Sequence, residues 1–355
     1  MFMIDLTMGL ANPTIQSPRS LGDACVSVVI PAFNESDNLT VLLPKLQQIL
    51  TDLGSDWEVL VVDDGSVDAT ALLMQTWSGN LGFRFIQLSR NFGKEAALTA
   101  GIEAAQGDVV VLMDADLQHP PELISEMVTC WESGVDMVYA VRTSREDEPW
   151  LKRVGTKLFY SLLRTEQGVQ VPPHAGDFRL MDRAVVQSLL MLPERNRFMK
   201  GLYAWVGFRT QALPYKPQGR HAGRSHFDVF KLWRLALAGL MSFTTWPLRA
   251  VSIVGFVVSF CALMYGIFIV IKHLMFASDV AGWPTIVTIL LFFSGINLLS
   301  LGIVGEYVAR IFEEVKARPI YLIQQKKGSA ARGKGPKATK NEGQDGNANQ
   351  NHPKQ

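Results

Sequence analysis

The chain has 355 residues, 48% of them hydrophobic, and a formal net charge of +1. This length fits one large domain or two ordinary ones, and the balanced charge excludes an overall field that would attract nucleic acid. Three cysteines, Cys25, Cys130 and Cys261, lie far apart without CxxC spacing. This usage is typical of a reducing compartment and argues against a structural disulfide or zinc site.

The first 24 residues show no signal-peptide pattern, and we expect them to form a flexible lead-in. After them, apolar runs alternate with segments of helical spacing. The expected strands are 26–31, 57–64, 83–91 and 109–113, and the expected helices are 38–50, 69–77 and 94–106. This alternation predicts an α/β fold with a mostly parallel, Rossmann-like sheet.

Polar loops follow the expected strands at their carboxyl ends, at 31–35, 63–66, 89–94 and 114–118. In parallel α/β sheets, ligands bind beyond the carboxyl ends of the strands. The four loops are therefore expected to converge on one binding site.

The loop after the fourth strand carries Asp114, Asp116 and Gln118. Residues spaced i, i+2 in an extended segment face the same way, and hard divalent ions such as Mg²⁺ prefer oxygen ligands. The spacing therefore indicates a Mg²⁺ or Mn²⁺ site. The alternative is a helix N-cap at Asp116, with Pro120 and Pro121 opening a helix.

The loops after the second and third strands hold further candidates. Asp63 and Asp64 can accept hydrogen bonds from a base or ribose, or they can cap a turn that Gly65 permits. Lys94 stands at a helix start, where an anion is favoured. A surface salt bridge is the alternative interpretation of Lys94.

Two uncharged segments, 251–271 and 284–305, are each about the ~20 residues that a helix needs to cross a bilayer. Two buried core helices are the alternative, although such helices usually keep a polar face. The connector 272–283 holds a single Lys, whereas several Lys and Arg residues follow the second segment. This asymmetry places both termini in the cytoplasm. Basic amphipathic segments at 150–164 and 227–240 are expected to lie in the membrane interface.

The expected organisation follows from these segments. It comprises a flexible lead-in (1–24), a catalytic domain (25–225), a juxtamembrane amphipathic helix (226–247), a two-helix transmembrane hairpin (248–308), a cytoplasmic juxtamembrane segment (309–327) and a disordered basic tail (328–355).

Several stretches together carry a resemblance to a known family. "VVIPAFNE", "VVDDGSVDAT", "RNFGKEAALTAG" and "DADLQHPPE" resemble glycosyltransferase family 2 with the GT-A fold. "GDFRLMDR" and "GRSHF", followed by two apolar spans, are similar to polyprenyl-phosphate glycosyltransferases such as bactoprenol glucosyltransferases and dolichol-phosphate mannose synthases. One departure is His226, where many relatives carry Lys.

The resemblance implies an enzyme of the bacterial inner membrane. It would transfer one sugar, with inversion, from a nucleotide sugar (UDP-linked, glucose favoured) to polyprenyl (undecaprenyl) phosphate at the cytoplasmic face, and it would form a homotetramer. The implied site residues are catalytic Asp177 and Asp116; nucleotide-binding Pro31, Phe33, Glu35, Asp63, Asp64, Lys94 and Asp114; metal-binding Asp114, Asp116 and Gln118; and, for the acceptor phosphate, Arg142, Arg145, Arg179 and Arg224.

The role of Asp177 stays open between a general base and a positioning charge, because a phosphomonoester with a second pKa of roughly 6 is already an anion. A salt bridge to Arg179 is a third possibility. Two rival functions are a processive polysaccharide synthase and a noncatalytic scaffold for a flippase or partner glycosyltransferase. The first is disfavoured because the chain has no QxxRW motif, and the second because the motif acids are all present.

Overall fold

The structure is a computed structural model that describes residues 19–142, 175–195, 197–215, 282–328 and 332–334, together with isolated residues between 251 and 275. Its first half contains η1 (Leu21–Asp23), β1 (Cys25–Ala32), α1 (Ser36–Asp52), β2 (Asp56–Asp63), α2 (Thr70–Trp77), β3 (Phe83–Leu88), α3 (Lys94–Ala104), β4 (Val109–Leu112) and α4 (Leu123–Glu132). Each strand and helix expected between 26 and 113 is present within a few residues of its predicted bounds.

The second half adds β5 (Met137–Arg142), β6 (Ala175–Asp182), α6 (Arg183–Leu190), α7 (Met199–Trp205), β7 (Thr210–Tyr215), α10 (Trp283–Val315), β8 (Ile323–Lys327) and β9 (Gly333–Lys334). In the described part of the chain these strands form one nine-stranded sheet with the order β7-β5-β6-β4-β1-β2-β3-β8, and β9 pairs with β2. The four central strands are parallel, whereas β6 runs antiparallel to both β4 and β5. The sheet is therefore mixed but mostly parallel at its centre, as predicted.

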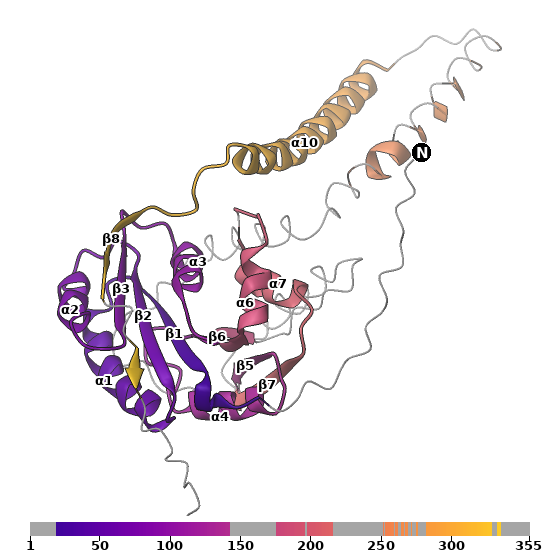
Figure 1. Cartoon of the computed structure of the whole chain (residues 1–355). Coiled ribbons are helices and arrows are strands. Elements are labelled where there is room, and N and C mark those ends of the chain that lie inside the picture. Colours follow the sequence, from indigo (N-terminus) through magenta and orange to yellow (C-terminus); the bar gives the residue numbers. More distant parts are fainter. Residues whose placement is uncertain are drawn as a thin grey trace, which may run out of the picture.

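Helices cover both faces of the central strands (Figure 1). Alternate residues of β1 point to opposite faces: Val28 packs in a core with α1, α2 and α4, and Val29 packs in a second core with α3, α6 and α7. Because both faces are covered, the strands are apolar throughout, which explains the unbroken apolar runs in the sequence.

The strand order reverses between β1 and β4, since β1 is followed in space by β2 on one side and by β4 on the other. At such a point the loops that leave the two strands diverge and open a crevice, where ligands bind in open α/β sheets. The loops that begin at Phe33 and Met113 border this crevice.

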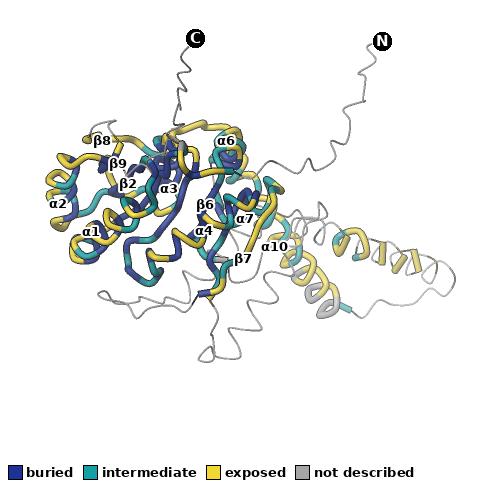
Figure 2. The backbone as a smooth tube through the Cα atoms, turned by 60° about the horizontal axis from the view of Figure 1, so that its bottom comes forward, coloured by how far each residue is buried: buried dark blue, intermediate teal, exposed yellow. Residues whose placement is uncertain are grey.

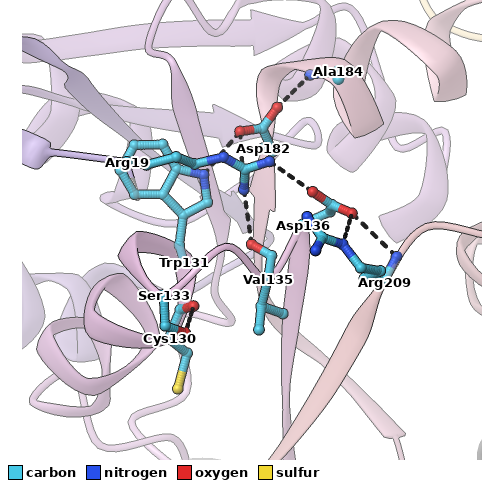
Figure 3. Close-up of polar contacts among 9 residues, drawn as sticks. All are labelled: Arg19, Cys130, Trp131, Ser133, Val135, Asp136, Asp182, Ala184 and Arg209. Carbon is cyan, nitrogen blue, oxygen red and sulfur yellow. Dashed lines mark hydrogen bonds and ion pairs between the residues drawn. The ribbon is translucent and has the colours of Figure 1, made fainter. Parts of the chain in front are cut away.

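The opposite, amino-terminal edge of the central strands is closed by a polar network around Arg19 (Figure 3). The Arg19 guanidinium lies 2.6 Å from Asp136 and 3.5 Å from Asp182. Trp131 donates its indole N–H to Asp182 at 2.8 Å, and Arg209 reaches Asp136 at 3.2 Å. The last residues of the expected flexible lead-in are thus anchored to the sheet, and the prediction of flexibility up to residue 24 is wrong for residues 19–24.

The C-terminal part differs from its predicted organisation. β8 pairs with the edge strand β3, and β9 pairs with β2, both antiparallel. Gly333 makes the second pairing possible, because a Cβ there would lie 2.2 Å from the Trp57 ring. The predicted juxtamembrane segment 309–327 therefore contains a sheet strand, and the predicted disordered tail from 328 contains another.

Within the described residues, one helix is long and apolar enough to cross a membrane. This is the Phe292–Val315 portion of α10, with a mean hydropathy of 1.4 and none of its most apolar window buried. α10 extends away from the sheet (Figure 1), and most of its described side chains are exposed (Figure 2). The helix covers the second predicted span. Most of the first predicted span, 251–271, lies outside the described residues, as do both predicted amphipathic segments.

Candidate active site

The loop after β4 turns one set of side chains inward and the other outward. Ala115 and Leu117 are buried at 2% and 6% exposure, whereas Asp114, Asp116 and Gln118 are partly exposed. The exposure alternates as the i, i+2 spacing predicts, but the loop is a turn and not the extended segment that the prediction assumed, because Leu117 has φ +59°. The alternative of a helix N-cap at Asp116 is wrong, because α4 begins only at Leu123 and its N-cap is Glu122.

The pairing of β6 with β4 brings a third acid to this loop. Arg179 lies opposite Leu112 in the antiparallel register, so Asp177, two residues earlier on β6, extends beyond the end of β4 toward Asp114. The Lys94 amino group lies between these two acids, 2.6 Å from Asp114 Oδ1 and 2.7 Å from Asp177 Oδ2. Lys94 thus bridges a predicted metal ligand and a predicted catalytic acid.

The charges of this cluster fix the ionisation of Asp177. Burial by itself raises the pKa of Asp177, but the positive charges of Lys94 and Lys200 outweigh burial and lower it to about 2. Although burial lowers the pKa of Lys94, the two carboxylates raise it above its ordinary value. Near neutral pH, Asp177 is therefore a fixed negative charge and a weak proton acceptor. The suggested salt bridge from Asp177 to Arg179 is replaced by the one to Lys94.

Glu95 is a site residue that the sequence analysis did not single out. Burial and the charge of Asp177 raise the pKa of Glu95 to about 7. One carboxylate oxygen accepts a hydrogen bond from the backbone N–H of Met199, and Oε2 has no hydrogen-bond partner within the described residues. The only sequence signal was an acid in the first turn of α3, which is common at helix starts.

Asp63 and Asp64 have different partners. Asp63 is fully buried and accepts a hydrogen bond from Ser66 N at 2.9 Å. The Asp64 carboxylate accepts hydrogen bonds from Phe92 N at 2.7 Å and Gly93 N at 2.8 Å. Both acids hold backbone in place: the first closes the turn after β2, and the second fixes the loop that leads to Lys94.

The loop after β1 supplies an aromatic side chain at the same edge. Pro31 is buried within β1, whereas the Phe33 side chain is 44% exposed and is not ordinary core packing. Burial raises the pKa of Glu35, and the charges of Asp116 and Asp114 raise it further against a hydrogen bond from Asn38. Glu35 therefore lies close enough to the β4 loop for the charges of its acids to affect the pKa of Glu35.

The predicted acceptor-phosphate residues lie in different surroundings. Arg142 is exposed and donates a 2.6 Å hydrogen bond to Gln118 Oε1, so it borders the β4 loop. Arg179 is 3% exposed, donates to Gly176 O and lies 3.4 Å from the centre of the Tyr203 ring. Arg145 and Arg224 lie outside the described residues.

A divalent ion fits the chemistry of the β4 loop. Among the described residues, no group of three or more His, Cys, Asp and Glu side chains is placed to hold a metal. The partly exposed residues of the loop instead carry two carboxylates and an amide oxygen, a set that suits Mg²⁺ or Mn²⁺ when phosphate and water oxygens complete the shell.

Comparisons with known proteins identify the family of this chain. Residues 27–190 match the Glycosyl transferase family 2 domain. The chain is 45% identical to an uncharacterized glycosyltransferase of Synechocystis over 84% of this chain and 94% of that protein. It is 39% identical to the SfII prophage-derived bactoprenol glucosyl transferase of Shigella flexneri over 84% of this chain and 97% of that protein.

Among solved structures, glucosyl-3-phosphoglycerate synthase from Mycobacterium tuberculosis matches 62% of this chain and 79% of that chain, with 22% identity and a TM-score of 0.43. This likeness is too distant to place a ligand. The match to the family domain and the similarity to glycosyltransferases over 84% of the chain together establish that the chain is a glycosyltransferase that belongs to glycosyltransferase family 2.

Proposed function

We propose that this enzyme transfers a single sugar from a nucleotide sugar to a polyprenyl phosphate at the cytoplasmic face of the bacterial plasma membrane. UDP-glucose is the favoured donor and undecaprenyl phosphate the favoured acceptor. The observation that carries the proposal is the meeting of Asp114, Asp177 and Lys94 within 2.6–2.7 Å at the carboxyl edge of the sheet. The similarity to a protein named bactoprenol glucosyl transferase supports the lipid acceptor.

The donor would lie along the crevice between the loops after β1 and β4. Phe33 offers an exposed ring for the nucleoside, and Lys94, at the first position of α3, offers a cation at a helix start for the diphosphate. A Mg²⁺ or Mn²⁺ ion held by Asp114, Asp116 and Gln118 would neutralise the charge that develops on the leaving diphosphate.

The acceptor requires little proton removal. Its phosphate is ionised near neutral pH, because the second pKa of a phosphomonoester is roughly 6. Direct attack of a phosphate oxygen on the anomeric carbon forms the new C–O bond as the bond to the diphosphate breaks, which inverts the configuration. Asp177 would position the sugar and stabilise positive charge that develops on it, since a pKa of about 2 leaves it unsuited to accept a proton.

The position of the site next to the membrane is part of the proposal. The Phe292–Val315 span of α10 would hold the chain in the bilayer, and the polyprenyl phosphate would enter from the headgroup region. The exposed Arg142, beside Gln118, would meet its phosphate.

A panel of nucleotide sugars, incubated with undecaprenyl phosphate and the full-length protein in detergent and read by mass spectrometry, tests the proposal. We expect one product that carries a single hexose, no product after EDTA, and recovery with Mg²⁺ or Mn²⁺. Products with several sugars would support a processive synthase instead, and no product from any donor would support a noncatalytic scaffold. Labelling of cysteines introduced at 274–282 and at 340 in intact cells tests the topology, and only the first should react from outside.

A further inference from the structure

Lys94 is the shared ion-pair partner of Asp114 and Asp177, two acids that are expected to have different roles. Its amino group lies 2.6 Å from Asp114 and 2.7 Å from Asp177. Within the described residues, neither acid makes another ion pair. One lysine therefore compensates both the carboxylate expected to bind metal and the carboxylate expected to face the sugar.

This arrangement conflicts with metal binding at Asp114. A divalent ion on Asp114 would lie within a few ångströms of the Lys94 ammonium, and like charges at that distance repel strongly in a partly buried site. The carboxylate oxygen that Lys94 occupies, Oδ1, is also lost to the ion while the bridge persists. A metal ion at Asp114 therefore competes with Lys94 for this carboxylate.

The structure gives Lys94 room to move. Its side chain is 42% exposed, and a lysine is a point charge on a flexible four-carbon stem. The other contacts of this loop, from Phe92 N and Gly93 N to Asp64, involve backbone and do not hold the lysine side chain.

We propose that Lys94 is an exchangeable counter-ion: it bridges Asp114 and Asp177 before metal and nucleotide bind, and it moves from Asp114 to the donor diphosphate when they do. This inference rests on the proposed nucleotide-sugar donor. The exchange couples metal binding to nucleotide binding, because the diphosphate gives Lys94 a new partner when the metal takes Asp114. Metal alone then binds weakly, and metal with nucleotide binds well.

The exchange predicts effects of opposite sign in Lys94→Met. Mn²⁺ alone should bind more tightly, because its competitor for Asp114 is gone. UDP in the presence of Mn²⁺ should bind more weakly, because its cation is gone. Couplings between two ligands typically correspond to ~5–150-fold changes in affinity, and we expect about tenfold in each direction.

Affinities are measured on the full-length protein in detergent, with Mn²⁺ followed by electron paramagnetic resonance and UDP by calorimetry. Lys94→Arg retains a cation and should keep the weak Mn²⁺ binding of the wild type. Lys200→Met is the matched control: Lys200 lowers the pKa of Asp177 without an ion pair to it among the described residues, and its loss should leave Mn²⁺ binding unchanged.

Unchanged or weaker binding of Mn²⁺ alone to Lys94→Met, in protein whose thermal unfolding remains cooperative, would overturn the exchange and leave Lys94 as a fixed bridge. Failure of the proposed function looks different: the wild type would bind Mn²⁺ but no UDP or GDP at all, which removes the donor and the exchange together. A general loss of structure in Lys94→Met would weaken the binding of both Mn²⁺ and UDP. The exchange instead predicts tighter binding of Mn²⁺ and weaker binding of UDP, so the two outcomes are distinguishable.

Discussion

Two acidic turns follow two buried parallel strands of this sheet, yet they have different roles. The first turn, Asp63–Ser66, directs its carboxylates to backbone N–H groups at 2.7–2.9 Å. In the second turn, Asp114–Gln118, Lys94 reaches Asp114 and Arg142 reaches Gln118, each at 2.6 Å, and Asp116 accepts a 3.2 Å hydrogen bond from Gln118 N within the turn itself. Judged from the sequence alone, the acids of both turns are candidate ligand contacts.

The nature of the partner explains the difference. A backbone N–H cannot leave its acceptor unless the loop that carries it rearranges, so the first turn is a fixed part of the scaffold. A lysine or arginine side chain can rotate away and expose its acceptor. The partly exposed Asp114, held by a side-chain cation, and Asp116, held by a 3.2 Å bond within its own turn, are therefore more available to a ligand than Asp63 and Asp64. The comparison predicts losses of activity at the second turn and losses of stability at the first.

The largest effect is expected at the second turn. Asp116→Asn keeps the shape of the side chain but removes a charge next to the leaving diphosphate. We expect kcat to fall by about 10²–10³-fold, the scale for loss of one preorganised electrostatic group, with no change in Tm. Asp108→Asn is the control, because Asp108 caps the amino end of β1 at the opposite edge through Cys25 N and should retain full activity.

Asp177→Asn should also lower kcat, by roughly 10²-fold or more, because it removes the charge that faces the sugar. The pH profile distinguishes charge from base. With its pKa held at about 2, Asp177 is ionised throughout pH 5–9, so the wild type and the variant should show parallel profiles of kcat over that range. An acidic limb present only in the wild type would show that Asp177 accepts a proton.

At the first turn, Asp64→Ala leaves Phe92 N and Gly93 N without their carboxylate. Loss of partners for buried donors costs about 1–3 kcal/mol, and thermal unfolding in detergent should show a lower Tm. The folded Asp64→Ala protein, below its Tm, should still bind Mn²⁺. A variant as stable as the wild type but unable to bind nucleotide would reverse the assignment and make Asp64 a ligand contact.

Gly65→Ala tests how closely the first turn approaches the loop before α3. Gly65 has φ +73°, and a Cβ there would lie 2.6 Å from the Arg90 carbonyl carbon. We expect a loss of stability of about 1–3 kcal/mol from strain. Gly93→Ala is the matched control, because φ is +100° but no atom lies within 4 Å of the added Cβ. The fall in Tm should be smaller for Gly93→Ala than for Gly65→Ala.

The smallest effect concerns the pH dependence of stability at Glu95. Its pKa rises from 4.5 when unfolded to about 7 when folded, so the folded state binds the proton more tightly and stability falls as pH rises between these values. Glu95→Gln removes this dependence while it retains an acceptor for Met199 N–H. The Tm of the wild type relative to Glu95→Gln should therefore decline from pH 5 to pH 8 and then level off. A constant difference would mean that Glu95 has an ordinary pKa.

Much of this protein was predictable from local sequence. Runs such as Val109–Leu112 are apolar on both faces, which predicts buried parallel strands, and the polar residues after each run mark the carboxyl edge. The i, i+2 spacing of Asp114, Asp116 and Gln118 matches their alternating exposure, although the left-handed Leu117 turns the loop out of the extended conformation. The start of α3 at Lys94 was also predictable from neighbouring residues.

Only the tertiary structure decided which acids are already engaged. Asp64 meets N–H groups 28 and 29 residues away, and Asp177 meets Lys94 83 residues away; no local spacing encodes such partners. The pairing of β8 with β3 was not predictable, because β8 is a polar segment without a strand pattern. An edge strand pairs through its backbone, so its own side chains can be polar. The sequence thus determined where the site lies, and long-range packing determined how its charges are balanced.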